Sequence, residues 1–283
     1  MNQLIPRIEF LLQSIFRKQL YCPHCGSHEI QKIAKKYGLI RIEKCTECGL
    51  FFTSPIYKPL LFPELYDKLY KAEGSTTEMP TSKNLMSLKD REFNGSDKYF
   101  GDRIQAIAHY TKGRNLLEIG SSWGYFLYQA QLHGFNATGI ELSDTRRKYG
   151  IDNLKVNVFK DIDDVKSKKF DLIYSSHTLE HFTDISTIFS KLSNCLKVGG
   201  KLILEVPNFD WLFIGESILP IIGAVHPLGF SSDFFQQNLP EYGFKIVAFY
   251  NSWSDFPDQK AVKSQGDVIL LLAEKVTGSN DEC

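Results

Sequence analysis

The chain has 283 residues, of which 43% are hydrophobic, and its 33 lysines and arginines balance its 33 aspartates and glutamates. Single domains usually span about 100–200 residues, so this length predicts one catalytic-sized domain with a smaller module. The balanced charge disfavours a protein that binds nucleic acid over its whole surface, because no large field of one sign is available. No apolar run reaches the roughly 18 residues of a membrane span.

The first residues, MNQLIPRIEFLLQSIF, place apolar side chains at helical spacing. This pattern predicts an amphipathic packing helix over residues 1–19. Glu9 interrupts the apolar part, and the stretch shows neither the basic leader nor the small-residue cleavage site of an export signal. We therefore expect a cytoplasmic protein with no membrane span.

Four of the six cysteines form two CxxC pairs, CPHC and CTEC, with nineteen residues between them. This spacing is typical of a four-thiolate zinc site, and a glycine after each pair lets the backbone turn beside the metal. Four thiolates leave no open coordination position, so the Zn²⁺ is expected to be structural. Two disulfides are the alternative, which a reducing compartment disfavours. The predicted ligands are Cys22, Cys25, Cys45 and Cys48.

After the amino-terminal helix, the composition of the chain predicts three further segments. Residues 20–58 are expected to form a zinc ribbon, whose two short strands meet at a Tyr-Gly turn between the cysteine pairs. Residues 59–92 are expected to be a helical connector and linker, with a helix over 62–71 and a polar stretch over 74–83. Residues 93–283 are expected to form the catalytic domain.

Strands and helices alternate through residues 97–283. A helix over 97–110 precedes strands at 115–120, 136–142, 154–159, 170–176 and 201–206, the last of which follows a Gly199-Gly200 turn. Such alternation predicts a parallel sheet covered on both faces. The final two strands lie too close for a helical crossover and should pair antiparallel. We expect an α/β fold: a Rossmann-like, seven-stranded, doubly wound sheet with the last strand antiparallel.

The stretch LLEIGSSWGYF ends the first of these strands. Ligands of open parallel sheets bind at the carboxyl ends of the strands, which places a pocket at Gly120 to Gly124. A dinucleotide fingerprint needs a middle glycine, but this chain has Ser122, and the spacing is one residue short. Glu118 would repel a diphosphate and attract a cation. S-adenosylmethionine fits, because it carries a sulfonium and an ammonium and no phosphate.

Glu141 follows Gly120 by 21 residues, where a carboxylate can accept both ribose hydroxyls.

The order ExGxSxG, GIELS, FDLIYSSHTLEHFTD and LKVGGKLILEVPN resembles class I S-adenosylmethionine-dependent methyltransferases over about residues 97–275. It is most similar to the group in which the fourth strand runs into Leu-Glu-His and a zinc-knuckle pair precedes the fold. The resemblance implies that the first motif holds the methionyl part, that Glu141 holds the ribose and that Asp161 meets the adenine. The implied cofactor-binding residues are Glu118, Gly120, Ser122, Gly124, Glu141, Asp161 and Ser176.

Methyl transfer from a sulfonium needs a base only if the nucleophile is weakly acidic. His177 and His181 follow the fourth strand, and His226 precedes a later helix. We expect His181 and His226 to act as base or orienting group, although both could be substrate contacts. The long apolar connection over 207–230 is expected to be a lid or pocket wall that contains Phe209, Trp211 and Phe213. The alternative is a hydrophobic insertion that packs on the core or on a second subunit.

The expected acceptor is a small polar molecule such as a sugar or sugar nucleotide, methylated on O, N or C. A ribosomal or transfer RNA methyltransferase is the first alternative, because the ribbon carries basic residues. A NAD-dependent oxidoreductase and a zinc-ribbon adaptor with a vestigial catalytic fold are the others. The oligomeric state is not predicted. The basic ribbon residues are Lys32, Lys35, Lys36, Arg41 and Lys44.

Overall fold

The computed structural model describes residues 19–36, 38, 40–56, 78–210, 218–223 and 226–276. The predicted helix over 62–71 lies outside the described residues, as does the predicted amino-terminal helix apart from Gln19. None of the described helices is long and apolar enough to cross a membrane.

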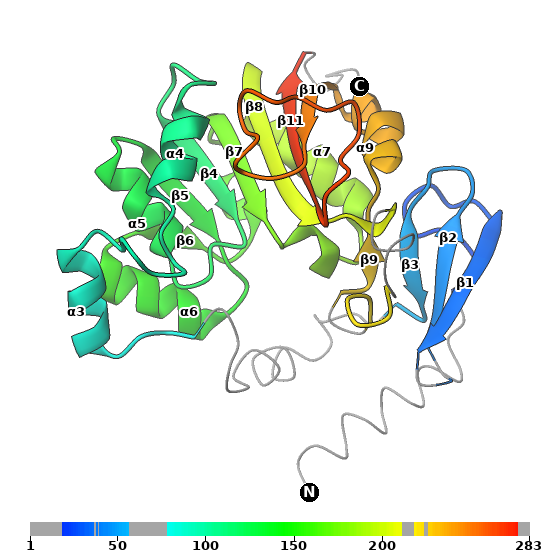
Figure 1. Cartoon of the computed structure of the whole chain (residues 1–283), viewed down its shortest axis with the longest axis horizontal. Helices are drawn as coiled ribbons and strands as arrows, with labels where there is room; N and C mark the ends of the chain where they lie inside the picture. Colours follow the sequence, from blue (N-terminus) through cyan, green and yellow to red (C-terminus); the bar gives the residue numbers. More distant parts are fainter. Residues whose placement is uncertain are drawn as a thin grey trace, which may run out of the picture.

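The described chain forms a small sheet beside a larger one that helices cover (Figure 1). The strands are β1 (Ile30–Lys36), β2 (Ile40–Cys45), β3 (Phe51–Ser54), β4 (Asn115–Ile119), β5 (Asn136–Ile140), β6 (Asn157–Phe159), β7 (Phe170–Ser176), β8 (Leu196–Pro207), β9 (Leu228–Gly229), β10 (Phe244–Tyr250) and β11 (Val268–Lys275). The α-helices are α3 (Ser82–Asp90), α4 (Gly101–Ala108), α5 (Tyr125–Leu132), α6 (Asp144–Tyr149), α7 (Ile185–Cys195) and α9 (Ser232–Asn238).

The larger sheet has seven strands in the order β10-β11-β8-β7-β4-β5-β6. β11 pairs antiparallel with both β8 and β10, whereas the pairs from β8 to β6 are parallel. The predicted Rossmann-like, doubly wound sheet with its last strand antiparallel is therefore confirmed. The order places the ends of β4, β5, β7 and β8 side by side, where a ligand site is expected.

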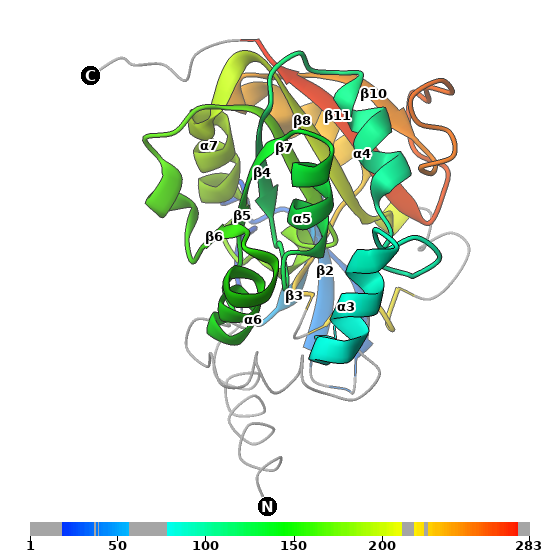
Figure 2. The same ribbon diagram turned by 90° about the vertical axis from the view of Figure 1, so that its left-hand side faces the viewer.

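Successive strand residues face two separate cores, as the period of two requires. Leu116 packs in one core with α3, α4 and α5, whereas its neighbour Leu117 packs in the other with α7 and α9. Figure 2 shows α7 on one side of the sheet and α4 and α5 on the other. Both strand faces are apolar because both are covered.

Two local boundaries differ from the predictions. β8 begins at Leu196, and Leu196 pairs with Phe170 while Lys201 pairs with Leu172, so the intervening residues bulge from the ladder where a turn was expected. The polar stretch predicted over 74–83 ends earlier than expected, because α3 begins at Ser82 within it and continues to Asp90, near the end of the predicted helical connector and linker. Thr81 caps this helix by accepting a hydrogen bond from the Asn84 N–H.

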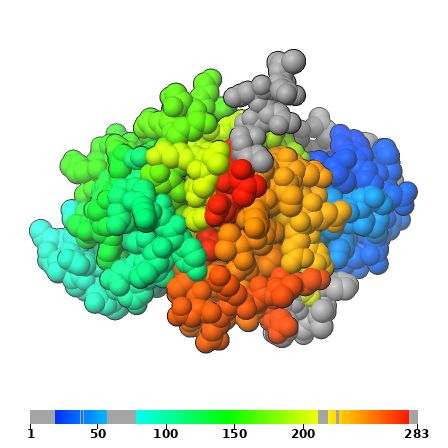
Figure 3. Space-filling model, turned by 90° about the horizontal axis from the view of Figure 1, so that it is seen from above, coloured from blue at the N-terminus to red at the C-terminus, as the bar shows by residue number. Residues whose placement is uncertain are grey.

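The smaller sheet has the order β1-β2-β3-β9. The predicted hairpin of β1 and β2 is present and antiparallel. β9 comes from the connection that was expected to be a lid, and it pairs with β3. The buried cysteines Cys22, Cys45 and Cys48 lie in the same hydrophobic cluster as Phe230 and Phe234. The ribbon is thus continuous with the main core, and Figure 3 shows it against the α9 segment.

Candidate functional site at the carboxyl ends of the strands

The glycine turn after β4 has a backbone that side chains would disrupt. Gly120 has φ +81°, and a Cβ there would lie 2.1 Å from Oγ1 of Thr178. Gly124 has φ +84° and begins α5, and a Cβ there would lie 2.7 Å from Val156. Both positions therefore require glycine for space as well as for conformation.

Ser122 adopts the same left-handed conformation, with φ +50°. Its N–H donates a hydrogen bond to Oε2 of Glu141 at 2.9 Å. The serine thus keeps the turn geometry that a glycine would favour, at a cost of roughly 1–2 kcal/mol in backbone strain. Its hydroxyl is buried and has no hydrogen-bond partner among the described residues, which leaves it available to a ligand.

Glu141, just after β5, is held by two backbone donors. Its Oε2 accepts from Ser122 and its Oε1 accepts from the Ser143 N–H at 2.8 Å. Burial raises the pKa of Glu141, while the N–H of Ser143 and the charge of Arg146 oppose that rise. Because a carboxylate oxygen accepts more than one hydrogen bond, the oriented group can still receive two hydroxyl donors.

Glu118, near the end of β4, is a buried carboxyl group. Its Oε2 has no hydrogen-bond partner within the described part of the chain. Burial raises its pKa well above 4.5, and the nearby carboxylate of Glu141 raises it further. A bound cation would favour the ionised form of this group.

Asp161 and Ser176 lie at the ends of β6 and β7, as predicted, but each has a local partner. Asp161 is exposed, caps the 3₁₀ turn Ile162–Val165 and lies 3.4 Å from Nζ of Lys191. The Ser176 hydroxyl donates to Oε2 of Glu205 at 2.6 Å. Their contact with adenine or another part of the cofactor remains a prediction.

The partner of Ser176 belongs to a polar cluster that the sequence analysis missed. Arg103 of α4 donates to Oε2 of Glu205 at 3.0 Å. Its guanidinium also lies 4.9 Å from the ring centroids of both Phe100 and Trp253. Glu205 lies near the end of β8 as Glu118 lies near the end of β4, and that position was the signal available in the sequence.

A second polar cluster follows β7. Glu180 is 1% exposed, and Nδ1 of His177 approaches its Oε1 at 3.5 Å. The rings of His181 and His226 meet edge to face, with centroids 4.5 Å apart. Burial opposes ionisation of Glu180, but the His177 contact and the neighbouring histidines bring its pKa below 4.5. The structure thus joins the two predicted histidines and adds Glu180, which was identified only as part of a motif.

The connection before α9 contributes buried residues to the core wherever the structure describes it. Phe209 is fully buried, with its ring 5.6 Å from that of Phe51. It packs against the ribbon sheet, as the alternative of a packed insertion predicts; Trp211 and Phe213 lie outside the described residues. The Thr53 N–H donates to the carbonyl of Pro227 at 2.9 Å, so the ribbon holds the residue next to His226.

The cysteine cluster fits a tetrahedral metal. The Sγ atoms of Cys22 and Cys48 lie 3.5 Å apart, and those of Cys25 and Cys45 lie 3.6 Å apart. All four sulfurs lie within 4.8 Å of one another. Four sulfurs about 2.3 Å from a central zinc would be separated by about 3.8 Å, so the observed arrangement is close to that of a zinc site.

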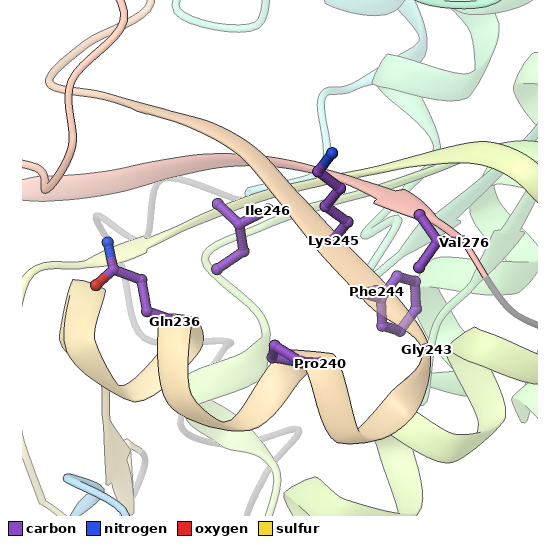
Figure 4. A pocket seen from close by; sticks show the side chains of 7 residues that line it. All are labelled: Gln236, Pro240, Gly243, Phe244, Lys245, Ile246 and Val276. Atoms are coloured by element: carbon purple, nitrogen blue, oxygen red, sulfur yellow. The ribbon is translucent and has the colours of Figure 1, made fainter.

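Of two surface hollows, only one lies near the carboxyl ends of the parallel strands. One of about 510 Å³ is lined by α9 and β10 residues, including Gln236 and Phe244 (Figure 4). It lies at the start of β10, opposite the edge where the ligand is expected. Another of about 520 Å³ includes Trp123 of the glycine turn and Thr81 and Leu88 from the α3 region. The second hollow adjoins the predicted cofactor site.

The sequence matches a family model described as a methyltransferase domain over residues 91–248, more than half of the chain. The chain therefore belongs to this family, and its sheet has the class I arrangement. A solved S-adenosylmethionine-dependent methyltransferase from Clostridium acetobutylicum has the same fold, with a TM-score of 0.50 and 13% identity over 75% of this chain and 100% of that one.

Two curated relatives are similar over shorter stretches. Malonyl-[acyl-carrier protein] O-methyltransferase 1 of Ilyobacter polytropus is 30% identical over 133 residues, which are 43% of this chain and 49% of that protein. The tRNA U34 carboxymethyltransferase of Dichelobacter nodosus is 27% identical over 177 residues, which are 54% of this chain and 56% of that protein. The chain thus spans about half the length of these relatives.

Proposed function

We propose that this protein transfers a methyl group from S-adenosylmethionine to an oxygen, nitrogen or carbon of a small polar acceptor. The observation that carries the proposal is the buried Oε2 of Glu118, which has no partner among the described residues and lies at a tight glycine turn. A dinucleotide diphosphate would add negative charge there, whereas a sulfonium and an ammonium supply the missing positive charge.

In this proposal Glu141 accepts hydrogen bonds from the ribose hydroxyls, and the turn residues Gly120, Ser122 and Gly124 contact the methionyl part. Asp161 and Ser176 are the proposed contacts to the rest of the cofactor. The sulfur leaves as a neutral thioether, so the protein mainly has to align nucleophile, methyl carbon and sulfur. Such alignment can lower a barrier by about 7–11 kcal/mol.

Basic residues of the ribbon already make contacts within the protein, and these contacts support a small acceptor over RNA. Lys36 donates to the Ile222 carbonyl at 2.8 Å, Arg41 pairs with Glu43, and Lys44 lies 3.7 Å from a carboxylate oxygen of Asp210. These intramolecular contacts compete with phosphate binding. We therefore favour a small acceptor, such as a sugar or sugar nucleotide.

An RNA acceptor remains the second candidate. Lys32 and Lys35 are exposed on β1, and one relative is named for a transfer RNA modification. Exposed lysines on an edge strand can contact a phosphate backbone without reading sequence.

We propose in addition that the four cysteines bind a structural Zn²⁺ and that the chain belongs to the Leu-Glu-His subgroup with an amino-terminal zinc ribbon. The sulfur separations and the continuity of the ribbon with the main core support the structural role. Four free thiolate ligands are typical of a reducing compartment, in keeping with the cytoplasmic location expected from the sequence.

The test is transfer of labelled methyl from S-adenosylmethionine into a cell extract that has been separated into metabolite and RNA fractions. We expect label in the metabolite fraction. Label confined to RNA would replace the favoured acceptor with the second candidate. Absence of label from both fractions, with saturating donor and zinc-loaded protein, would contradict the proposed activity.

A further inference from the structure

The carboxylate of Glu180 is buried and lies close to His181 and His226. The side chain is 1% exposed, and neither oxygen makes a hydrogen bond of ordinary geometry to a described residue. Its nearest basic atom is Nδ1 of His177, at 3.5 Å from Oε1. A buried carboxylate is costly unless it is well paired or coordinates a metal, and the single long contact with His177 leaves its second oxygen without a partner in the described part of the chain.

His226 is held by the main chain through one of its two ring nitrogens. Its Nδ1 lies 2.9 Å from the carbonyl oxygen of Ile221. A carbonyl only accepts, so Nδ1 of the neutral ring must carry the proton and Nε2 must carry the lone pair. A main-chain carbonyl that orients an imidazole in this way is the usual support of a metal-bound histidine.

We propose that Glu180, His181 and His226 bind a divalent transition-metal ion of the Fe²⁺, Co²⁺, Ni²⁺ and Zn²⁺ class. One carboxylate oxygen and one ring nitrogen from each histidine all lie within 4.8 Å of one another. Ligand atoms about 2.1 Å from a shared metal would be about 3.0–3.4 Å apart, so small side-chain rotations bring them to bonding distance. Two histidines and one carboxylate are a known ligand set for such metals.

This site differs in kind from the cysteine cluster. Four thiolates close the coordination sphere, whereas three protein ligands leave positions open to a small molecule. The site also adjoins the glycine turn, because Thr178, next to the turn that carries Glu180 and His181, lies against Gly120. The metal would hold an acceptor oxygen as a Lewis acid beside the methyl donor, a role that rests on the proposed function.

The test uses full-length protein whose cysteine site is already filled with zinc, titrated with Co²⁺. Nitrogen and oxygen ligands give Co²⁺ visible d–d absorption without the intense near-ultraviolet band of thiolate ligation. We expect one such Co²⁺ per chain. Glu180→Gln, His181→Gln and His226→Gln should each weaken Co²⁺ binding at least tenfold, in line with the loss of one ligand. The exposed His133→Gln is the matched control and should bind as the parent protein does.

Two outcomes would overturn the proposed site. One is the absence of Co²⁺ binding in the millimolar range; the other is binding that survives all three ligand substitutions. S-adenosylmethionine binding is measured on the same samples by calorimetry. Donor binding without Co²⁺ binding would reject the metal site and leave the proposed methyl transfer intact. Co²⁺ binding without donor binding would reject the proposed function and retain the metal site.

Discussion

The N–H of Ser122 donates a hydrogen bond to Oε2 of Glu141 at 2.9 Å and so ties the glycine turn after β4 to the end of β5. Two neighbouring strand ends are therefore organised by one carboxylate, which the Ser143 N–H fixes from its other side. The ribose and methionyl contacts of the proposed cofactor would be set by the same hydrogen bonds.

Glu141→Gln should weaken both the turn and the cofactor site. A glutamine amide would direct one N–H toward a backbone N–H that now donates to an oxygen, leaving a buried donor unsatisfied. We expect the free energy of unfolding to fall by about 1–3 kcal/mol. The dissociation constant for S-adenosylmethionine should rise at least tenfold. Denaturant unfolding and calorimetry check both effects, with the exposed Asp152→Asn as control; unchanged binding would contradict the role given to Glu141.

We expect the binding of S-adenosylmethionine to change the protonation of Glu118. Burial and Glu141 raise its pKa, so at a pH below that raised pKa the free protein holds a proton that the cationic donor would expel. S-adenosylmethionine binding should therefore release protons and strengthen as the pH rises through this pKa. Calorimetry in two buffers of different ionisation enthalpy should give different apparent enthalpies, and Glu118→Gln should reduce the difference. Equal enthalpies for the parent protein would argue against this account.

The same raised pKa has a consequence for stability. A carboxyl whose folded-state pKa lies above its unfolded value of about 4.5 holds its proton longer in the folded state. Its contribution to the free energy of unfolding therefore falls as pH rises from about 4.5 toward the folded pKa. Glu118→Gln should match the parent in acid and exceed it in stability at higher pH. Denaturation midpoints across this range measure the difference; a gap that narrowed with rising pH would have the wrong sign.

Gly120→Ala and Gly134→Ala form a matched pair. Both glycines have positive φ, +81° and +82°, so either substitution pays a similar backbone cost. A Cβ at Gly120 would meet Thr178, whereas a Cβ at Gly134 meets nothing within 4 Å. We expect Gly120→Ala to lose donor binding at least tenfold more than Gly134→Ala at similar helical content by circular dichroism. Equal donor binding by the two variants would show that the glycine turn is not part of the donor-binding site.

Zinc removal should destabilise more than the ribbon. Cys22, Cys45 and Cys48 share a cluster with Phe234, and the Asn238 side chain donates to the Cys48 carbonyl at 3.0 Å. We therefore expect chelation to lower the melting temperature of the catalytic domain as well, by about 2–4 °C for each kcal/mol lost. Hydrogen exchange should show α9 losing protection. Cys195 is not one of the four proposed zinc ligands, so Cys195→Ser should keep one zinc per chain. An unchanged melting curve after verified metal loss would contradict this coupling.

Features with a local or periodic origin were predictable from the sequence. Alternating segments predicted the parallel sheet and its antiparallel last strand, and the spacing of Cys22, Cys25, Cys45 and Cys48 predicted a cluster that the structure does assemble. Ser122 was identified as a departure from the glycine pattern, but its left-handed backbone could not be known, because neighbours on β5 impose it.

Features made by distant residues were not predictable. β9 has two residues, and only its pairing with β3 makes it a strand. Glu180 and His226 are far apart in the chain and meet because the ribbon holds the Pro227 carbonyl through Thr53. Phe209 was expected near a pocket because it is aromatic and lies in a long loop, yet such a side chain packs equally well against the ribbon.

Calorimetric titration of the full-length, zinc-loaded protein with S-adenosylmethionine and, separately, with NADH tests the central claim most directly. The buried carboxylate at the glycine turn predicts one S-adenosylmethionine site per chain with micromolar affinity and no saturable NADH binding. Saturable NADH binding, or no heat of binding with S-adenosylmethionine, would contradict the account.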